Sequence, residues 1–293
     1  MEPAVIPIME RSLNAGGSAY HIVMTEEDLS SSYPGMKRYT VRLSSEGRTL
    51  GLVRTNSYEY PPSTSLRARD VAAETTTRWE ENLLRDPDTF LSSLPPIPAT
   101  GRRILPKRGV VIIQGSPRPG GNCALLASWA ADAARQRGEE ATVHFPHDLD
   151  IHPCIGCYQC YNTGTCIFDD DMAAIIEDVS RSRLVVVCSP VYTNSVPAGL
   201  KALIDRFQAL HAERTFSAET GTGKGLLLAV AGRQGSQNFR CVKAVAGAFF
   251  SLLGITPANP ILIDGMDQKG DLNSFPDVRE QVRTSVNECL IEG

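Results

Sequence analysis

Four of the eight cysteines in this 293-residue chain lie close together, in the segment CIGCYQCYNTGTC. Their spacing is C-x2-C-x2-C-x5-C, and they are Cys154, Cys157, Cys160 and Cys166. Four thiolates on a short, turning loop are the ligands that a [4Fe–4S] cluster requires. Gly156 and Gly164 give the backbone freedom to bend around such a cluster. The segment therefore predicts an iron–sulfur site in the loop 152–168.

Two other chemistries use clustered thiols. Structural zinc sites usually pair two C-x2–4-C knuckles across a longer stretch. A redox-active C-x-x-C disulfide leaves two of the four cysteines unexplained. The cluster is therefore favoured, with thiol or disulfide chemistry next and zinc last. Asp169, Asp170 and Asp171, just beyond the loop, are interpreted as charges at the start of a helix rather than ligands, and neither His147 nor His152 receives a role.

A loop of small residues, GSPRPGGN at 115–122, follows an unbroken apolar segment. Ser116 supplies a hydroxyl, Arg118 a bidentate partner for phosphate, and Asn122 a cap for the helix expected next. The N–H groups and the positive end of that helix would attract an anion. The loop has neither the Gly-Lys-Ser/Thr of a Walker A sequence nor the Rossmann glycine spacing, which argues against ATP and against a dinucleotide held in the usual manner. A plain strand-to-helix turn is the alternative.

A second loop, SPVYTNS at 189–195, follows the apolar segment LVVVC. It offers apolar contacts together with hydroxyl and backbone hydrogen bonds, which a flat, amphipathic ring system needs. Tyr192 could instead be an ordinary core aromatic. Its position at the end of a strand favours the binding role.

Together, GSPRPGGN and CSPVYTNSVPAGLKALIDR resemble the two signature segments of the NAD(P)H-dependent FMN reductase and iron–sulfur flavoprotein group, over about residues 109–290. The resemblance implies a flavodoxin-like fold that binds FMN. The residues that it assigns to FMN are Ser116, Arg118, Gly121, Asn122, Cys123, Pro190, Val191, Tyr192, Thr193, Asn194, Ala231 and Gly232. Two features depart from the family pattern: Cys123 stands where a Thr or Ser commonly contacts the phosphate, and Arg233-Gln234 interrupts a run of small residues.

The elements that must position these loops alternate regularly. Apolar strands are expected at 110–114, 141–145, 184–188, 226–231 and 260–263, and helices at 122–137, 199–210, 236–253 and 276–290. Such alternation indicates an α/β fold with a parallel sheet covered on both faces. Five such strands favour the flavodoxin-like doubly wound order 2-1-3-4-5, whose ligand lies at the switch point between strands 1 and 3.

The chain is expected to divide into three parts. Residues 1–94 predict a small α+β module of unknown role, with strands at 20–27, 38–43 and 49–55 and a helix at 69–85. The proline-rich segment 95–108 is interpreted as a linker. Residues 109–293 form the FMN domain, into which the cysteine loop 152–168 is inserted.

Composition restricts the partners. The net charge is only −4, so no nucleic-acid partner is expected. No apolar run approaches the roughly 18–20 residues that span a bilayer, and the first residues lack the pattern of a secretion signal. We therefore expect a cytoplasmic protein without a membrane partner.

FMN exchanges one or two electrons and a [4Fe–4S] cluster exchanges one. The predicted function is an oxidoreductase that passes electrons from ferredoxin or NAD(P)H to a small acceptor. Two alternatives stay open: an FMN-dependent reductase or dehydrogenase whose cysteines act as thiols or as a disulfide, and a redox sensor. The family resemblance implies a homodimer or homotetramer.

Overall fold

The computed structural model describes residues 5–97, 108–216 and 223–291. By its internal contacts the chain forms two units. The described residues of the first unit are 5–97, 155–167 and 212–216, and those of the second are 108–154, 168–211 and 223–291. Most of the expected linker lies outside the described residues. The middle of the cysteine loop, which the sequence analysis placed in the FMN domain, makes its contacts within the first unit instead.

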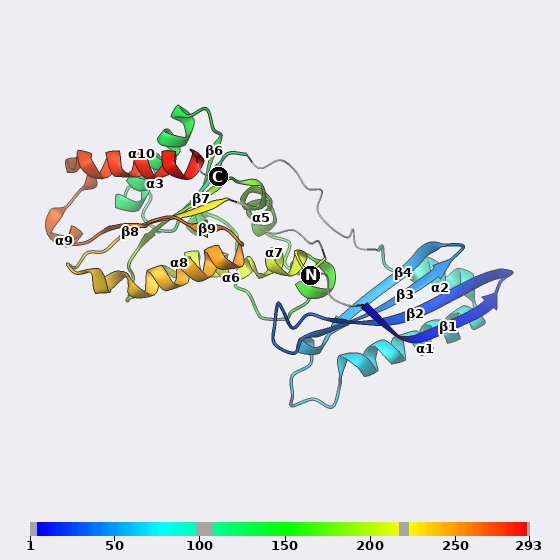
Figure 1. The fold of residues 1–293 in the computed structure, drawn as a ribbon. Coiled ribbons are helices and arrows are strands. Elements are labelled where there is room, and N and C mark those ends of the chain that lie inside the picture. The colour runs from blue at the N-terminus through cyan, green and yellow to red at the C-terminus, as the bar shows by residue number, and fades with distance from the viewer. Residues whose placement is uncertain (1–4, 98–107, 217–222, 292–293) are drawn as a thin grey trace. The chain divides into compact units, whose positions relative to one another are not determined.

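An antiparallel sheet with the strand order β1-β2-β3-β4 forms the body of the first unit (Figure 1). Its strands are β1 (Val5–Ala15), β2 (Ser18–Asp28), β3 (Lys37–Ser45) and β4 (Arg48–Asn56), followed by the 3-10 helix η1 (Ser57–Glu59), α1 (Ala68–Arg85) and α2 (Pro87–Ser93). Side chains alternate between faces along a strand. Tyr39, Val41 and Leu43 of β3 therefore share one face, where they pack with Trp79 and Leu83 of α1.

Strands β2, β3 and β4 and helix α1 agree with the expected elements, but β1 was not expected. The strand contains Pro7, which cannot donate to a ladder. In the structure β1 is an edge strand, and its register with β2 shifts between Pro7 and Met9. Gly16 and Gly17, both at positive φ, form the tight turn to β2. That Gly-Gly pair was the available signal for a hairpin.

The second unit is a doubly wound α/β fold. Parallel strands β5 (Val110–Gln114), β6 (Ala141–His144), β7 (Leu184–Pro190), β8 (Lys224–Val230) and β10 (Ile261–Ile263) lie in the order β6-β5-β7-β8-β10, and β9 (Thr256–Pro257) also pairs with β8. Numbered along the chain, the five strands have the order 2-1-3-4-5. The predicted flavodoxin-like topology is thus confirmed.

Helices cover both faces of this parallel sheet (Figure 1). The longer ones are α3 (Asn122–Gln136), α5 (Met172–Arg181), α6 (Ala198–Arg206), α8 (Arg240–Leu252) and α10 (Pro276–Ile291), and the shorter ones are α7 (Gln208–Glu213), α9 (Met266–Lys269), η2 (Pro146–Asp148), η3 (Ser236–Phe239) and η4 (Leu272–Ser274). The helix expected over 199–210 is divided into α6 and α7, and the one expected over 236–253 begins as η3.

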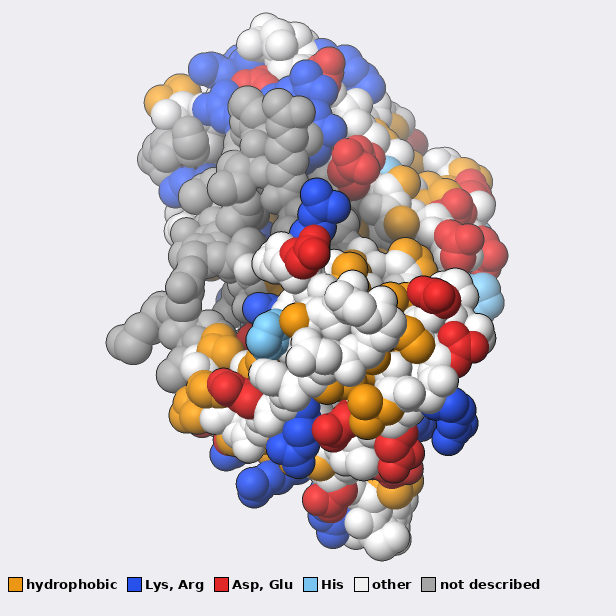
Figure 2. Space-filling model, turned by 90° about the vertical axis from the view of Figure 1, so that its right-hand side faces the viewer, with side chains coloured by type: hydrophobic (Ala, Val, Ile, Leu, Met, Phe, Trp, Pro, Cys, Tyr) orange, Lys and Arg blue, Asp and Glu red, His pale blue; other side chains and the backbone are white. Residues whose placement is uncertain are grey.

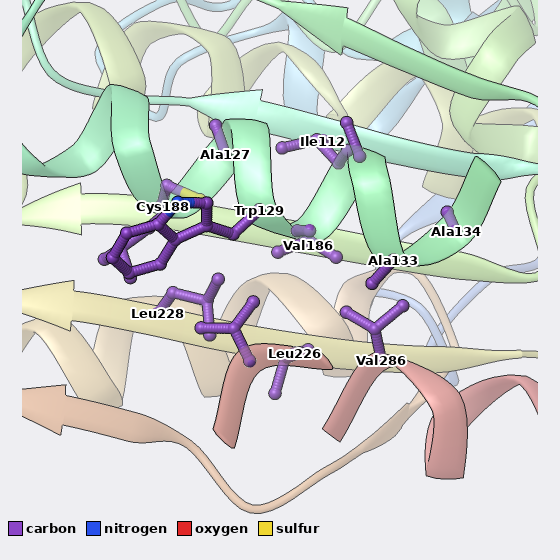
Figure 3. Packing of buried hydrophobic residues seen from close by; sticks show 14 of the residues in the cluster. Ile112, Ala127, Trp129, Ala133, Ala134, Val186, Cys188, Leu226, Leu228 and Val286 are labelled. Carbon is purple, nitrogen blue, oxygen red and sulfur yellow. The ribbon is translucent and has the colours of Figure 1, made fainter. Parts of the chain in front are cut away.

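Alternate residues of the strands supply the two cores of this unit. Ile112, Val186 and Leu228 are fully buried in a cluster with residues of α3 and α10. Figure 3 shows these side chains beside Trp129 of α3 and Val286 of α10. Burial of each such side chain contributes roughly 1.5–3 kcal/mol. The sheet is therefore a firm platform for the loops at its edge.

Two surface properties bear on partners. On the face of the molecule drawn in Figure 2, basic and acidic side chains are interspersed with polar and apolar ones. Within residues 5–97, 108–216 and 223–291, no helix is long and apolar enough to cross a membrane.

Candidate functional site

A pocket of about 1080 Å³ opens at the carboxyl ends of β5, β7, β8 and β10. All twelve residues that the sequence analysis assigned to FMN line it. Those twelve residues come from three separate loops, which the strand order 2-1-3-4-5 places at one edge of the sheet. Ligands of open α/β sheets bind at this position, where the strand order reverses.

Gln114 holds the loop after β5 by hydrogen bonds. This residue was not among those predicted from the sequence. The Ser116 N–H donates to Gln114 Oε1 over 2.6 Å, and Gln114 Nε2 donates to the Arg118 carbonyl over 3.3 Å. The Arg118 N–H in turn donates to Ser116 Oγ. Gln114 is buried and does not line the pocket, so the shape of this loop is set by a group outside the pocket lining.

Asn122 does not have the role expected of it. The N-cap of α3 is Gly121, and Asn122 is the first helical residue. Its side-chain amide donates to the Gly270 carbonyl over 3.3 Å and accepts from the Leu272 N–H over 3.1 Å. Asn122 therefore ties the loop after β5 to the loop after β10 and does not cap its own helix.

Donors for an anion remain at the start of α3. Among the described residues, the backbone N–H groups of Gly120, Asn122 and Cys123 have no hydrogen-bond partner. Arg118 also lines the pocket. Unpaired N–H groups at the positive end of a 15-residue helix, with an arginine in the same pocket, suit a phosphate group.

Cys123 contributes only its backbone to this arrangement. Its side chain is 3% exposed and packs in the hydrophobic core. Burial raises the pKa of the thiol to about 12. The side chain that replaces the family's Thr or Ser is thus turned away from the pocket, so it offers no substitute for the missing hydroxyl.

The loop after β7 is a tight hairpin. Tyr192 and Ser195 exchange two backbone hydrogen bonds of 2.9 Å, with Thr193 and Asn194 between them. Both central residues have positive φ, 45° and 63°. A β-branched residue rarely adopts this conformation, and such strain often marks a functional segment. Tyr192, 38% exposed, presents its ring at the pocket.

The third wall joins the loops after β8 and β10. The N–H groups of Met266 and Asp267 donate to the carbonyls of Ala231 and Gly232. A Cβ on Gly232 would lie 2.4 Å from Asp267 Oδ1, so only glycine fits here without displacing that carboxylate. Asn238 donates to the carbonyls of Arg233, Gln234 and Gly235 and holds the loop in place.

Part of the pocket lining was not predicted from the sequence. The additional residues are Gly120, Val230, Arg233, Asn238, Met266, Asp267, Gly270 and Asp271. The segment 266–271 follows the fifth strand directly, and the rule that ligands bind at the carboxyl ends of strands would have included it. Arg233, read as an interruption of the glycine-rich turn, instead lines the pocket, and among the described residues the N–H groups of Gly232 and Arg233 have no hydrogen-bond partner.

At the foot of the cysteine loop lies a buried ion pair. The carboxylate of Asp170 accepts from both terminal nitrogens of Arg206, over 2.5 and 2.9 Å. The N–H groups of His152 and Met172 also donate to it. Burial alone would raise the pKa of Asp170, but these hydrogen bonds outweigh burial and lower that pKa to about 2. Asp170 lies at the start of α5, as expected, where it accepts from the Met172 N–H. Its second role, the pairing with Arg206 that joins the two ends of the loop, was not expected.

The four cysteines are divided between the two units: Cys154 belongs to the second, and Cys157, Cys160 and Cys166 belong to the first. Cys154 is exposed, and Cys157, Cys160 and Cys166 are half-buried. Gly156 and Gly164 both adopt positive φ, so the loop turns where flexible bends were expected. Within the described parts of the chain, no three or more His, Cys, Asp or Glu side chains are close enough to hold a metal ion. The number and type of these donors fit an iron–sulfur cluster.

Comparisons with known proteins agree with the sequence motifs. The model of the family described as NADPH-dependent FMN reductase matches residues 109–265, more than half of the chain. An iron-sulfur flavoprotein of Methanosarcina thermophila is 36% identical over 39% of this chain and 59% of its own length. Another, of Methanocaldococcus jannaschii, is 35% identical over 44% of this chain and 65% of its own length. The chain thus spans about three fifths of the length of these two relatives.

A third relative is matched over more of its length. An iron-sulfur flavoprotein of Archaeoglobus fulgidus is 31% identical over 51% of this chain and 75% of its own length. Among solved structures, an NAD(P)H:quinone oxidoreductase from Methanothermobacter marburgensis has a TM-score of 0.49 at 17% identity, covering 61% of this chain and 94% of that one. That structural likeness is too low to bear on function. The family match and the flavoprotein relatives show that this chain belongs to the NADPH-dependent FMN reductase family, in its iron–sulfur flavoprotein group.

Proposed function

We propose that the pocket at the carboxyl edge of the parallel sheet binds FMN. The phosphate would lie at the start of α3, against Arg118 and the unpaired N–H groups of Gly120, Asn122 and Cys123. The isoalloxazine ring would lie between the Tyr192–Ser195 hairpin and the loop that begins at Ala231. The observation that carries this proposal is the convergence of a guanidinium and unpaired N–H groups on one side of a large pocket. Family membership also supports FMN.

Bound FMN would supply the exchange of one or two electrons. The residues of this chain bind and orient it. Arg118 and the helix start hold its anionic end, while the strained hairpin offers the ring an apolar face. The unpaired N–H groups of Gly232 and Arg233 would donate to polar atoms at the edge of the ring.

The second part of the proposal is a [4Fe–4S] cluster on Cys154, Cys157, Cys160 and Cys166. It rests on the number, type and spacing of the thiols and on the names of the flavoprotein relatives. Iron and sulfide analysis of anaerobically purified protein tests it. Four iron and four sulfide per chain are expected, and a Cys157→Ser variant should lose them. Protein that carries flavin but no iron would remove the cluster from the proposal.

The activity that we infer is electron transfer from a donor, NAD(P)H or ferredoxin, to a small acceptor such as a quinone. A homodimer or homotetramer and a cytoplasmic location complete the proposal. The decisive test is anaerobic reduction of the FMN-loaded protein. The donor should bleach the flavin absorbance and a quinone should restore it, over many turnovers. A protein that binds FMN and is reduced once, but never turns over, would contradict an enzymatic role and favour a redox sensor.

A further inference from the structure

The N-terminal residues 5–97 lie outside the segment 109–265 that the family model matches, and the FMN pocket does not use them. We propose that the sheet and η1 of this segment form a scaffold for the cysteine loop. Through hydrogen bonds and packing, the scaffold would hold the short helix α4 (Cys160–Thr163) and the residues just before it. It would thereby fix the positions of Cys157 and Cys160 and limit their access to solvent. This role is independent of FMN.

The first observation is the burial of a loop asparagine in the scaffold. Asn162, in α4, is 3% exposed. Its Oδ1 accepts from Asn56 Nδ2 over 3.0 Å, and its Nδ2 donates to the carboxylate of Glu59. Glu59 is held in turn by Thr55 and by the Asn56 N–H. A buried amide satisfied on both sides fixes an orientation, because moving it would leave several buried polar groups unpaired.

Two arginines of the sheet bind the end of the same helix. Arg38 donates to the Tyr161 carbonyl over 2.8 Å, and Arg54 donates to the Asn162 carbonyl over 3.2 Å. The last carbonyls of a helix have no intrahelical partner, so external donors stabilise its end. Both guanidinium groups also lie over the ring of Phe216, at 4.0 and 4.8 Å from its centroid. The scaffold thus acts as a C-terminal cap for a helix of only four residues, which is too short to be stable alone.

One of the two residues between Cys157 and Cys160 is held as well. Tyr158 has a φ of 57°, and its carbonyl accepts from Asn56 Nδ2 over 3.1 Å. Its ring packs against those of Tyr33 and Tyr58, with centroids 5.4 and 5.1 Å away. A bulky residue adopts this backbone conformation only where its surroundings enforce it. Asn56 therefore forms hydrogen bonds with two residues of the cysteine loop, Tyr158 and Asn162.

The charges of the scaffold suit an anionic loop. Arg38 pairs with Glu27, whereas Arg54 has no carboxylate partner among the described residues. Burial and the nearby charge of Arg38 lower the pKa of Arg54 to about 10, which still leaves it protonated at neutral pH. The Glu27 carboxylate attracts Arg54 from a distance but does not pair with it. A cation without a carboxylate in direct contact, at the helix that carries Cys160, favours negative charge there, as thiolates or a thiolate-bound cluster would supply.

The test uses full-length protein, reduced and iron-free. Mass spectrometry follows two rates: hydrogen exchange of the 158–163 amides and alkylation of each cysteine. Asn162→Ala removes the hydrogen bonds that the loop contributes, and Asn56→Ala removes those that the scaffold contributes. Arg42→Met is the matched control for Arg54→Met, since Arg42 is exposed on the neighbouring strand β3 and has no contact with the loop. The variants of Asn162, Asn56 and Arg54 should exchange these amides and alkylate Cys157 and Cys160 about tenfold faster or more, because each loses one or more buried hydrogen bonds.

FMN affinity and the reactivity of exposed Cys154 should stay unchanged in every variant. Exchange of the β2 amides reports whether the sheet itself stays folded. If Asn56→Ala unfolds the sheet, Asn162→Ala decides, since the residue that it replaces lies in the loop and not in the sheet. If the exchange of the 158–163 amides and the alkylation of Cys157 and Cys160 are unchanged in Asn162→Ala, the proposed scaffold role is overturned. If the protein fails to bind FMN, the rates of amide exchange and cysteine alkylation can still be measured. That failure would therefore count against the proposed function and not against the scaffold.

Discussion

Asp170 and Arg206 form a bidentate ion pair in which the two side chains are 0% and 1% exposed. The same guanidinium donates to the His152 carbonyl over 2.7 Å. His152 precedes the first cysteine of the loop and Asp170 follows the last, so this pair joins the two ends of the loop. The ring of His152 also stacks on Phe168, with centroids 5.0 Å apart.

Replacing Asp170 by Asn should destabilise the protein by about 3–5 kcal/mol, because the guanidinium of Arg206 would stay buried without its counter-charge. Asp169→Asn, at an exposed neighbouring position, is the control and should change the free energy of unfolding by less than about 0.5 kcal/mol. Denaturant unfolding of both variants measures this. Equal stability of the two would show that the pair contributes nothing.

The same pair predicts a pH dependence. The pKa of Asp170 is about 2 in the folded protein, against an ordinary value near 3.9. A carboxylate with a lowered pKa stabilises the fold above the ordinary value, and that contribution is lost as the pH falls from about 4 to about 2. Unfolding free energies across this range should fall more steeply in the native protein than in Asp170→Asn. Parallel curves for the two proteins would contradict the assignment.

A substitution in the Tyr192–Ser195 hairpin should raise the stability of the FMN-free protein. Thr193 is β-branched and has a φ of 45°, which strains its backbone. Asparagine tolerates this conformation, so Thr193→Asn should stabilise the FMN-free protein by about 1 kcal/mol. Thermal unfolding measures the change. A lower melting temperature would mean that the Thr193 side chain makes contacts that outweigh the strain.

Cys123→Ser tests whether the departure from the family pattern matters for binding. Because the thiol is buried in the core, a hydroxyl in its place would be desolvated and would not reach the pocket. The variant should lose about 1–3 kcal/mol of stability and gain no FMN affinity. In the native protein Cys123 should resist alkylation at pH 8, where exposed Cys154 reacts, since its pKa is about 12. Tighter FMN binding by the serine variant would show that position 123 faces the phosphate.

Much of the fold could be predicted from local patterns. Unbroken apolar runs such as 110–114 and 184–188 identify buried parallel strands, and the loops that follow them identify the switch point. The pocket was predicted for the same reason: Arg118 and Tyr192 follow those strands directly. Each of these inferences needs only residues that are neighbours in the sequence.

What could not be predicted depends on long-range partners. Asp170 appears to be one of three equivalent helix-start aspartates until Arg206, 36 residues away, is placed beside it. Asn162 was one residue of a turning loop until Asn56 and Glu59 surrounded it. Asn122 satisfies every rule for a cap, yet the loop at Gly270 and Leu272 competes for its amide and wins. Local propensity says nothing about such competition.

In the proposed complex, Arg118 and the start of α3 hold the phosphate of FMN. Titration of the flavin-free protein with FMN and with riboflavin, followed by flavin fluorescence, tests it most directly. The native protein should bind FMN at least tenfold more tightly than riboflavin, and Arg118→Ala should lose about 1.5–3 kcal/mol of FMN binding with little change for riboflavin. Equal affinity of the native protein for FMN and riboflavin, or equal losses for both flavins in Arg118→Ala, would contradict this account.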